Sequence, residues 1–302
     1  MELLTVFGNT ILPIFTIMAL GFILGRTGWI TVSEARVINR FTLSVFLPIF
    51  LFGVSSQVDI ARFTLLPIGT YLAVEFIVFM IGFTLAFHVL HRDASESLLL
   101  GMSGVVANNA FYVLPIALAL YGPQGAQPFV AITTVDGLIG FSAVILALEF
   151  VRHGRISWRV LGLAIIRSPI ILALMAGIAF AASGLVLPQP VTTFVDFNGA
   201  AAAPVALFAL GVVLSETTFR RDVVVALFVG VKLILFPACV WAAINLVSYR
   251  ESDAPIYVLS AAGPSVAMSL SLAILYNVRT ETIAQVMVWT GLFSLVSLML
   301  LA

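Results

Sequence analysis

The sequence predicts an all-α integral membrane protein with ten transmembrane helices, arranged as two inverted five-helix repeats in which helices 4 and 9 are broken and cross. Three observations predict this fold. Of the 302 residues, 62% are hydrophobic and 9% are charged, whereas soluble domains carry about 25% charged residues. Apolar segments follow one another along the chain, and two of them contain proline and polar residues at mid-membrane depth.

The apolar segments have the length that a membrane requires. A helix needs about 20 mostly apolar residues to cross the hydrocarbon core. We identify ten such segments, at residues 5–25, 37–55, 65–88, 97–121, 127–150, 160–182, 193–215, 223–247, 254–276 and 282–301. The loops between them are short and leave no room for a soluble domain. A net charge of zero gives no indication of a nucleic-acid partner.

Arginine residues are distributed unequally between the two sides of the predicted membrane. One side holds eleven, namely Arg26, Arg36, Arg40, Arg92, Arg152, Arg155, Arg159, Arg167, Arg220, Arg221 and Arg279. The opposite side holds only Arg62 and Arg250. The positive-inside rule places the arginine-rich side in the cytoplasm. We therefore expect a multi-pass protein of the cell (inner) membrane with both termini on the non-cytoplasmic side.

The two halves of the chain resemble each other at constant spacing. Six residues recur 156 positions later, so that Pro13, Gly21, Gly28, Pro48, Leu51 and Phe52 correspond to Pro169, Gly177, Gly184, Pro204, Leu207 and Phe208. Chance matching in a Gly-, Pro- and Leu-rich chain is the alternative. Five segments per half is an odd number, so the second half must insert upside down, as in many secondary carriers. The expected repeats are residues 1–152 and 153–302.

The fourth segment contains the first predicted break. Asn108 and Asn109 lie about 15 Å deep at 1.5 Å per residue, and Pro115 follows them. Proline removes an amide donor and clashes with the preceding turn, while an asparagine side chain can cap a freed N–H group. These residues predict an unwound site lined by amide groups. The alternative is a kinked helix whose asparagines bond to neighbouring helices.

The ninth segment contains the second break, at Gly263, Pro264 and Ser265. Glycine tolerates unusual backbone angles, and Pro264 interrupts the helix. In an inverted repeat the two breaks meet near the midplane, which brings positive and negative helix ends together. Positive helix ends favour anions such as carboxylates. We therefore expect a substrate or ion site at this crossing.

Three ionisable residues, Glu75, Asp136 and Lys232, lie roughly 13–17 Å deep in their segments. Intramembrane charges are costly and usually face a cavity or one another. In a functional interpretation, Lys232 attracts or balances an anion, and Asp136 or Glu75 couples transport to protons. In the alternative interpretation, Lys232 forms a structural pair with one of the acids and has no role in transport.

Other chemistries have little support in the sequence. The single cysteine, Cys239, excludes an internal disulfide and a thiolate-rich metal cluster, and three scattered histidines are poor evidence for a metal site. Ser103 lies in a GxSG motif, but a serine nucleophile needs a histidine base beside it, and no histidine lies in a later segment. No GxxxxGK[ST] phosphate loop is present. We expect neither a cofactor nor a metal, and no enzymatic activity.

Several segments together resemble the auxin efflux carrier family. They are LPIFLFGV (47–54), NNAFYVLPIALALYG (108–122), AAAPVALFALGVVL (201–214), Lys232 with Pro237, and AAGPSVAMSLSLAILYN (261–277). The resemblance implies a scaffold part (1–55 and 160–215) and a transport part (64–152 and 223–302). Substrate would bind at the crossing, where Asn109 and Pro115 fit the first crossover and Pro264 the second.

The expected function is secondary transport of a small organic anion, such as a mono- or dicarboxylate, by an elevator-type alternating-access mechanism. A sodium-coupled symporter of an organic acid is the first alternative. An intramembrane enzyme and a channel are more remote. Phe111 and Tyr112 depart from the Gly-rich pattern of many relatives, so the family's substrate does not transfer. The expected partners are the anion, the lipid bilayer and, by analogy with similar folds, a second copy of the chain.

Overall fold

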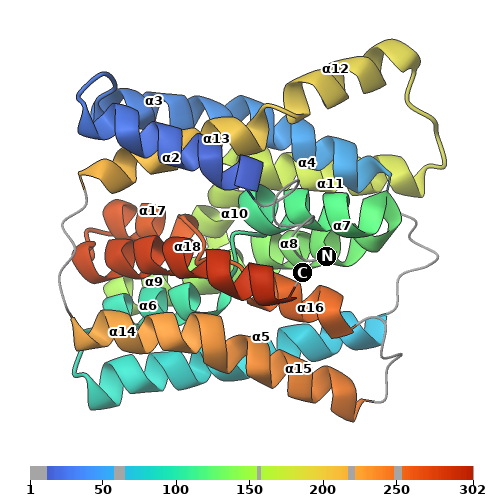
Figure 1. The fold of residues 1–302 in the computed structure, drawn as a ribbon. Helices are drawn as coiled ribbons and strands as arrows, with labels where there is room; N and C mark the ends of the chain where they lie inside the picture. Colours follow the sequence, from blue (N-terminus) through green and yellow to red (C-terminus); the bar gives the residue numbers. More distant parts are fainter. Residues whose placement is uncertain (1–11, 58–64, 155–157, 217–221, 248–253, 302) are drawn as a thin grey trace. The chain divides into compact units, whose positions relative to one another are not determined.

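The computed structural model describes residues 12–57, 65–154, 158–216, 222–247 and 254–301 (Figure 1). Regular structure within these ranges is helical throughout, in agreement with the predicted all-α class. The chain divides by its contacts into two units, and each is described by itself. Unit 1 comprises Met1–Phe63, Leu114–Gly137 and Gly162–Thr218, and unit 2 comprises Thr64–Val113, Leu138–Leu161 and Phe219–Ala302.

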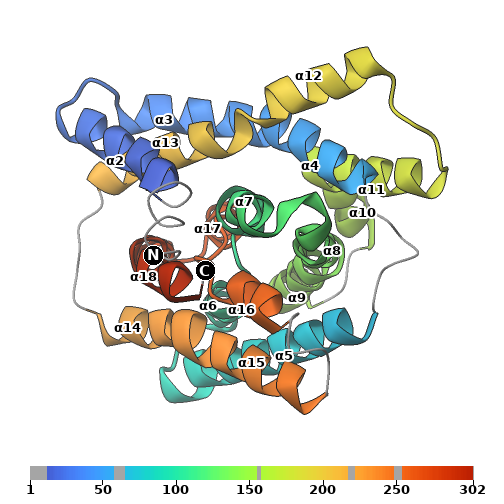
Figure 2. The same ribbon diagram turned by 45° about the vertical axis from the view of Figure 1, so that its right-hand side comes forward.

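Unit 1 is built from helices of both halves of the sequence. Its elements are α2 (Leu12–Arg26), α3 (Val32–Phe41), η2 (Thr42–Phe46), α4 (Leu47–Ser56), α7 (Leu114–Gly125), α8 (Gln127–Val135), α11 (Pro169–Ala182), α12 (Gln189–Gly199) and α13 (Ala202–Ser215). Helix α2 packs against α13, and α4 packs against α11 (Figures 1 and 2). Among the described residues, the chain passes from one unit to the other between Val113 and Leu114, within η6 (Asp136–Gly140) and within α10 (Trp158–Arg167).

Glycine residues allow α2 and α13 to pack with their backbones in close approach. A Cβ atom at Gly21 would overlap the carbonyl oxygen of Phe208, and one at Gly211 would overlap the carbonyl oxygen of Met18. Neither glycine has a positive φ angle, so each is required for space and not for backbone conformation. Small residues at such contacts are typical of membrane helices.

Unit 2 also combines both halves of the sequence. Its elements are α5 (Leu65–Thr84), η4 (Leu85–Val89), α6 (Ala94–Val105), η5 (Asn109–Val113), α9 (Phe141–His153), α14 (Val223–Gly230), η7 (Val231–Leu235), α15 (Phe236–Leu246), α16 (Ala254–Ala261), α17 (Met268–Leu275) and α18 (Glu281–Leu301). Helix α15 packs along α5, and α6 contacts α17 and α18 (Figures 1 and 2).

The described part of the chain contains four continuous helices that are long and apolar enough to cross a membrane. They are Val32–Ser56, Leu66–Val89, Gln189–Ser215 and Val223–Leu246. Shorter apolar helices occur at Thr16–Arg26 and Pro169–Ala182. This supports a membrane protein with several spanning helices, while the ten-helix count, the inverted repeat and the division into scaffold and transport parts stay predictions.

The predicted segments 97–121 and 254–276 are both interrupted. The first consists of α6, η5 and the first part of α7, with α6 and η5 separated at residues 106–108, and the second consists of α16 and α17, separated at residues 262–267. Two of the π-helical stretches, η5 and η7, carry Asn109 and Lys232. π-helical turns often mark functional sites. Asn109 and Lys232 are therefore the polar residues of unit 2 that we consider first.

Candidate functional site

The two interruptions in unit 2 pair with each other as a short antiparallel bridge. The amide of Asn108 donates to the carbonyl oxygen of Pro264 at 2.7 Å, and the amide of Val266 donates to that of Val106 at 3.1 Å. A helix broken in lipid must have its freed backbone groups satisfied within the protein. These two bonds satisfy four such groups, and they bring together segments more than 150 residues apart in the sequence.

Lys232 satisfies the carbonyl ends of the two half-helices that precede the breaks. Its ammonium group donates to the carbonyl oxygen of Val105 at 2.8 Å and to that of Ala261 at 2.9 Å. Val105 is the last residue of α6 and Ala261 is the last residue of α16. The ammonium also lies 4.9 Å from the ring centroid of Phe236, and Lys232 is fully buried.

Helix α18 supports the second break through two hydroxyl groups. The amide of Ser265 donates to Oγ1 of Thr290 at 3.1 Å, and Oγ of Ser297 donates to the carbonyl oxygen of Ala262 at 3.2 Å. Thr290 and Ser297 are seven residues apart, which places them on one face of the helix. This face of α18 therefore holds the unwound segment in position.

Two buried side chains at the paired breaks carry donor groups without a partner. Asn109 is 2% exposed and Ser265 is 1% exposed. Oδ1 of Asn109 accepts a hydrogen bond from Ser260 at 2.9 Å. Its Nδ2 group, and Oγ of Ser265, have no hydrogen-bond partner among the residues that the structure describes. An unsatisfied buried group costs about 1–3 kcal/mol, so each of these two atoms would gain stability from a hydrogen-bond partner.

A glycine is required at position 263 because there is no room for a side chain, and not because of an unusual backbone angle. The sequence suggested conformational freedom, but this glycine is not among those with positive φ. A Cβ atom at Gly263 would overlap Cγ2 of Val113. The absence of a side chain therefore lets the second break approach η5 closely, and the buried Pro264 follows it.

Glu75 belongs to a buried face of α5. It is 7% exposed, and Tyr71, one helical turn before it, is fully buried. The ring of Tyr71 lies 5.5 Å from that of Phe236 between centroids, and Oγ of Ser260 lies 3.4 Å from the Tyr71 hydroxyl. Because residues four apart share a helix face, Glu75 lies on the side of α5 that faces the polar interior of unit 2.

Three other predicted site residues lie elsewhere or are less enclosed. Asn108 is only partly buried, although its backbone takes part in the bridge. Pro115 is the second residue of α7, beyond the interruption at 106–108, and both it and Asp136 belong to unit 1. Asp136 is 5% exposed. The geometry of unit 2 thus brings together Asn109, Gly263, Pro264, Ser265 and the Lys232 ammonium.

Ser103 is occupied by a helix-internal hydrogen bond. Its hydroxyl donates to the carbonyl oxygen of Leu99 at 2.8 Å, and the residue is fully buried. The glycines beside it are packing positions, because a Cβ atom at Gly101 would contact Phe79 and one at Gly104 would contact Val231. The GxSG motif is therefore a close-packed face of α6.

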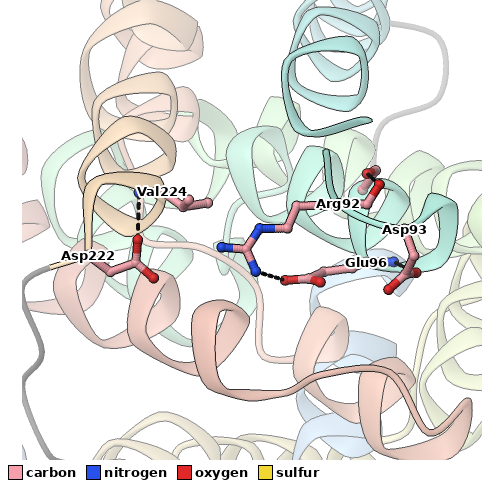
Figure 3. Close-up of polar contacts among 6 residues, drawn as sticks. Arg92, Asp93, Glu96, Asp222 and Val224 are labelled. Carbon is pink, nitrogen blue, oxygen red and sulfur yellow. Dashed lines mark hydrogen bonds and ion pairs between the residues drawn. The ribbon is translucent and has the colours of Figure 1, made fainter. Parts of the chain in front are cut away.

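An ionic cluster lies where α6 and α14 begin (Figure 3). Asp93 accepts a hydrogen bond from the amide of Glu96 at 2.9 Å, and Asp222 accepts one from the amide of Val224 at 2.8 Å. Both are N-caps. Arg92 lies 3.3 Å from the carboxylate of Glu96. Burial raises the pKa of Glu96 above its usual 4.5, and the charge of Arg92 opposes this.

Sequence reasoning missed the hydroxyl groups that hold the site together, namely those of Tyr71, Ser260, Thr290 and Ser297. One signal was present: Thr290 and Ser297 are polar residues spaced by two helical turns in an otherwise apolar segment. Their partners could not be inferred, because each bond joins different helices. The backbone carbonyls that Lys232 binds carry no sequence signal at all.

The chain is similar to known membrane transporters. A family model described as "Membrane transport protein" matches residues 6–302. A protein of Rhizobium meliloti (strain 1021) named "Putative malonate transporter" is 26% identical over 246 residues, which cover 78% of this chain and 76% of that protein. An "Uncharacterized transporter" of Methanothermobacter thermautotrophicus is 24% identical over 298 residues, which cover 96% of this chain and 95% of that protein.

Proposed function

Since this chain belongs to the membrane transport protein family, we propose that it is a secondary carrier of a small organic anion, a mono- or dicarboxylate, which binds at the paired breaks of unit 2. Membership confirms the resemblance to auxin efflux carriers. The family and the named relatives are transporters and not enzymes, and they imply a small-molecule substrate and a multi-pass membrane protein.

The asymmetry of the paired breaks is the observation that carries the proposal. The carbonyl ends of α6 and α16, which bear partial negative charge, are covered by the Lys232 ammonium. On the side where the helices resume, Asn109 and Ser265 carry donor groups that no described residue binds. At the paired breaks, the carbonyl ends of α6 and α16 are thus neutralised while two donor groups are left for a ligand, which is the arrangement that an anion requires.

The donor types fit a carboxylate. An amide N–H and a hydroxyl each donate to an ionised oxygen in a charge-assisted hydrogen bond, which is roughly twice as strong as a neutral one. The amino end of α17 (Met268–Leu275) adds a partial positive charge close to Ser265 in the chain. A carboxylate with one oxygen on Nδ2 of Asn109 and another on Oγ of Ser265 would satisfy both unpartnered atoms.

Malonate is the first substrate to test, because the relative from Rhizobium meliloti carries that name. In the proposed cycle, the part of the chain with the paired breaks moves the anion across the membrane by an elevator-type shift. Glu75 and Asp136 are the candidates for proton coupling. The inner-membrane location, the outward termini and a homodimer belong to this proposal as well.

The experiment is counterflow of radiolabelled malonate into proteoliposomes, with acetate and succinate as competitors. We expect saturable exchange that Asn109→Ala and Ser265→Ala weaken. Loss of one hydrogen bond to a charged ligand should raise the half-saturation concentration about tenfold, which corresponds to about 1.4 kcal/mol. Asn198→Ala is the matched control, because Asn198 is a partly exposed asparagine of unit 1 whose Nδ2 donates to the carbonyl oxygen of Phe194 in its own helix.

Three outcomes are decisive. Saturable exchange that both site variants weaken, and the control does not, supports the proposal. Absence of exchange with every carboxylate, from a protein that is folded and reconstituted, contradicts the anion assignment. Equal affinity in the parent and in both site variants contradicts the placement of the site at Asn109 and Ser265.

A further inference from the structure

Lys232 is the single lysine among 302 residues, and it is fully buried. It projects from the π-helical stretch η7 (Val231–Leu235) toward two backbone carbonyls that are 127 positions before it and 29 positions after it. The functional site described above assigns it no contact with substrate. We therefore infer the role of Lys232 from the two carbonyl groups to which its ammonium donates.

Both carbonyls lie at the same kind of position. Each belongs to the last residue of a half-helix, where the backbone carbonyls lack helical partners. The carboxyl end of a helix carries about half a negative charge. The two converging ends together present roughly one negative charge, and a single ammonium lies between them.

Such a pair of half-helix ends is a place where carriers with broken helices bind coupling cations. Unwound carbonyls and half-helix carboxyl ends coordinate sodium ions or protons in these proteins. Here the carbonyl oxygens of Val105 and Ala261 accept hydrogen bonds from a covalently attached cation at 2.8 and 2.9 Å. The Phe236 ring, 4.9 Å from the ammonium, adds a cation–π contact on a further side.

We propose that the Lys232 ammonium is a built-in cation that occupies the position of a coupling sodium ion between the ends of α6 and α16, so that this carrier moves its anion without sodium. The statement that transport needs no sodium rests on the proposed function. The structural part of the inference does not depend on the proposed function: removal of the ammonium exposes two acceptor carbonyls that a small free cation can bind.

The first test uses the parent protein. Counterflow of malonate is measured in sodium chloride, potassium chloride and choline chloride of equal ionic strength. We expect the same initial rate in all three salts. A rate that depends on sodium overturns the proposal, because the site would then be available to a free ion.

The second test measures the thermal stability of Lys232→Ala and Lys232→Ser in the same salts. Both variants should be less stable than the parent in choline chloride. Sodium should raise their midpoint temperatures by a few degrees, as expected for an ion that binds only the folded state. The parent should show no difference between sodium and choline.

Phe236→Ala is the matched control. It removes a large buried side chain beside the ammonium but leaves the ammonium on its two carbonyls. We expect lower stability without any response to sodium. Variants of Lys232 that lose stability and also ignore sodium and potassium overturn the built-in cation, because the lysine would then act only as a structural hydrogen-bond donor.

The stability test separates this inference from the proposed function. If malonate and other carboxylates show no counterflow, the substrate proposal fails, while a sodium response confined to the Lys232 variants still supports the cation position. If counterflow occurs and requires sodium in the parent, the proposed function stands and the inference about Lys232 fails. If the Lys232 variants do not fold, the salt dependence of the parent alone decides.

Discussion

The contact between α2 and α13 in unit 1 and the paired breaks in unit 2 both bring two backbones close together, but with different chemistry. In unit 1, Gly21 and Gly211 remove side chains so that intact helices can touch. In unit 2, the helices unwind and their backbones exchange hydrogen bonds. Intact helices satisfy their own backbone groups, whereas unwound segments need outside partners.

This difference separates packing from binding. Around Gly21 and Gly211 the α2–α13 contact joins the backbone of two intact helices, and its polar contact, from Arg26 to the carbonyl oxygen of Ser215, lies where both helices end. The paired breaks are surrounded by hydroxyl, amide and ammonium groups, and two of their donors have no partner in the described part of the chain. The polar groups that an unwound helix requires are thus the groups that the proposed site would use.

Gly211→Ala tests the first region and should have the largest effect. The added Cβ atom overlaps the carbonyl oxygen of Met18, so a helix must shift. We expect a loss of about 3 kcal/mol, the upper end of typical overpacking costs, measured by chemical or thermal unfolding in detergent. Gly162→Ala is the control, because its Cβ atom would meet nothing within 4 Å. Equal stability of the two variants would contradict the close contact.

Thr290→Val tests the second region and should have an intermediate effect. Valine keeps the shape of threonine but leaves the buried amide of Ser265 without its acceptor. We expect a loss of about 1–2 kcal/mol and weaker malonate counterflow, because the segment that carries Ser265 is no longer fixed. Thr70→Val, at a partly exposed threonine whose hydroxyl donates to the carbonyl oxygen of Leu66 in its own helix, should change neither quantity. A silent Thr290→Val would show that the bond does not position the break.

Glu96→Gln should have the smallest effect, a change in the pH dependence of stability. Burial raises the pKa of Glu96 above 4.5, while the charges of Arg92 and Arg279 lower it and those of Asp93 and Asp222 raise it. A raised pKa means that the folded state holds the proton more tightly, so this contribution to stability is complete below about pH 4.5 and is lost as the pH rises through the folded pKa.

The measurement is the midpoint temperature of the parent and of Glu96→Gln between pH 4.5 and 7.5. The parent should lose stability over this interval more steeply than the variant, which cannot titrate at this position. The same slope in both proteins would show that the pKa of Glu96 is not raised. The attraction between Arg92 and ionised Glu96 is part of the parent's pH dependence, because it acts only on the ionised carboxylate, and the variant lacks it at every pH.

Much of the organisation of this protein follows from its sequence. The composition and the apolar segments predicted an all-α membrane protein, and the motifs at residues 108–122 and 261–277 identified the family. The interruptions of the fourth and ninth segments also follow from local physics, because proline and polar residues are costly in the middle of a membrane helix. Each of these features depends on residues that are close together in the chain, and so the sequence alone determines it.

The partners at the site were decided only by the tertiary structure. Pro115 marked the correct segment, but the interruption falls at residues 106–108, where the backbone bonds to residues 264–266. Lys232 could be identified as a costly intramembrane charge, yet its partners are backbone carbonyls that every residue possesses. Which carbonyls lose their helical partners, and which ammonium or hydroxyl reaches them, depends on how helices distant in sequence pack, and that information is absent from any single segment.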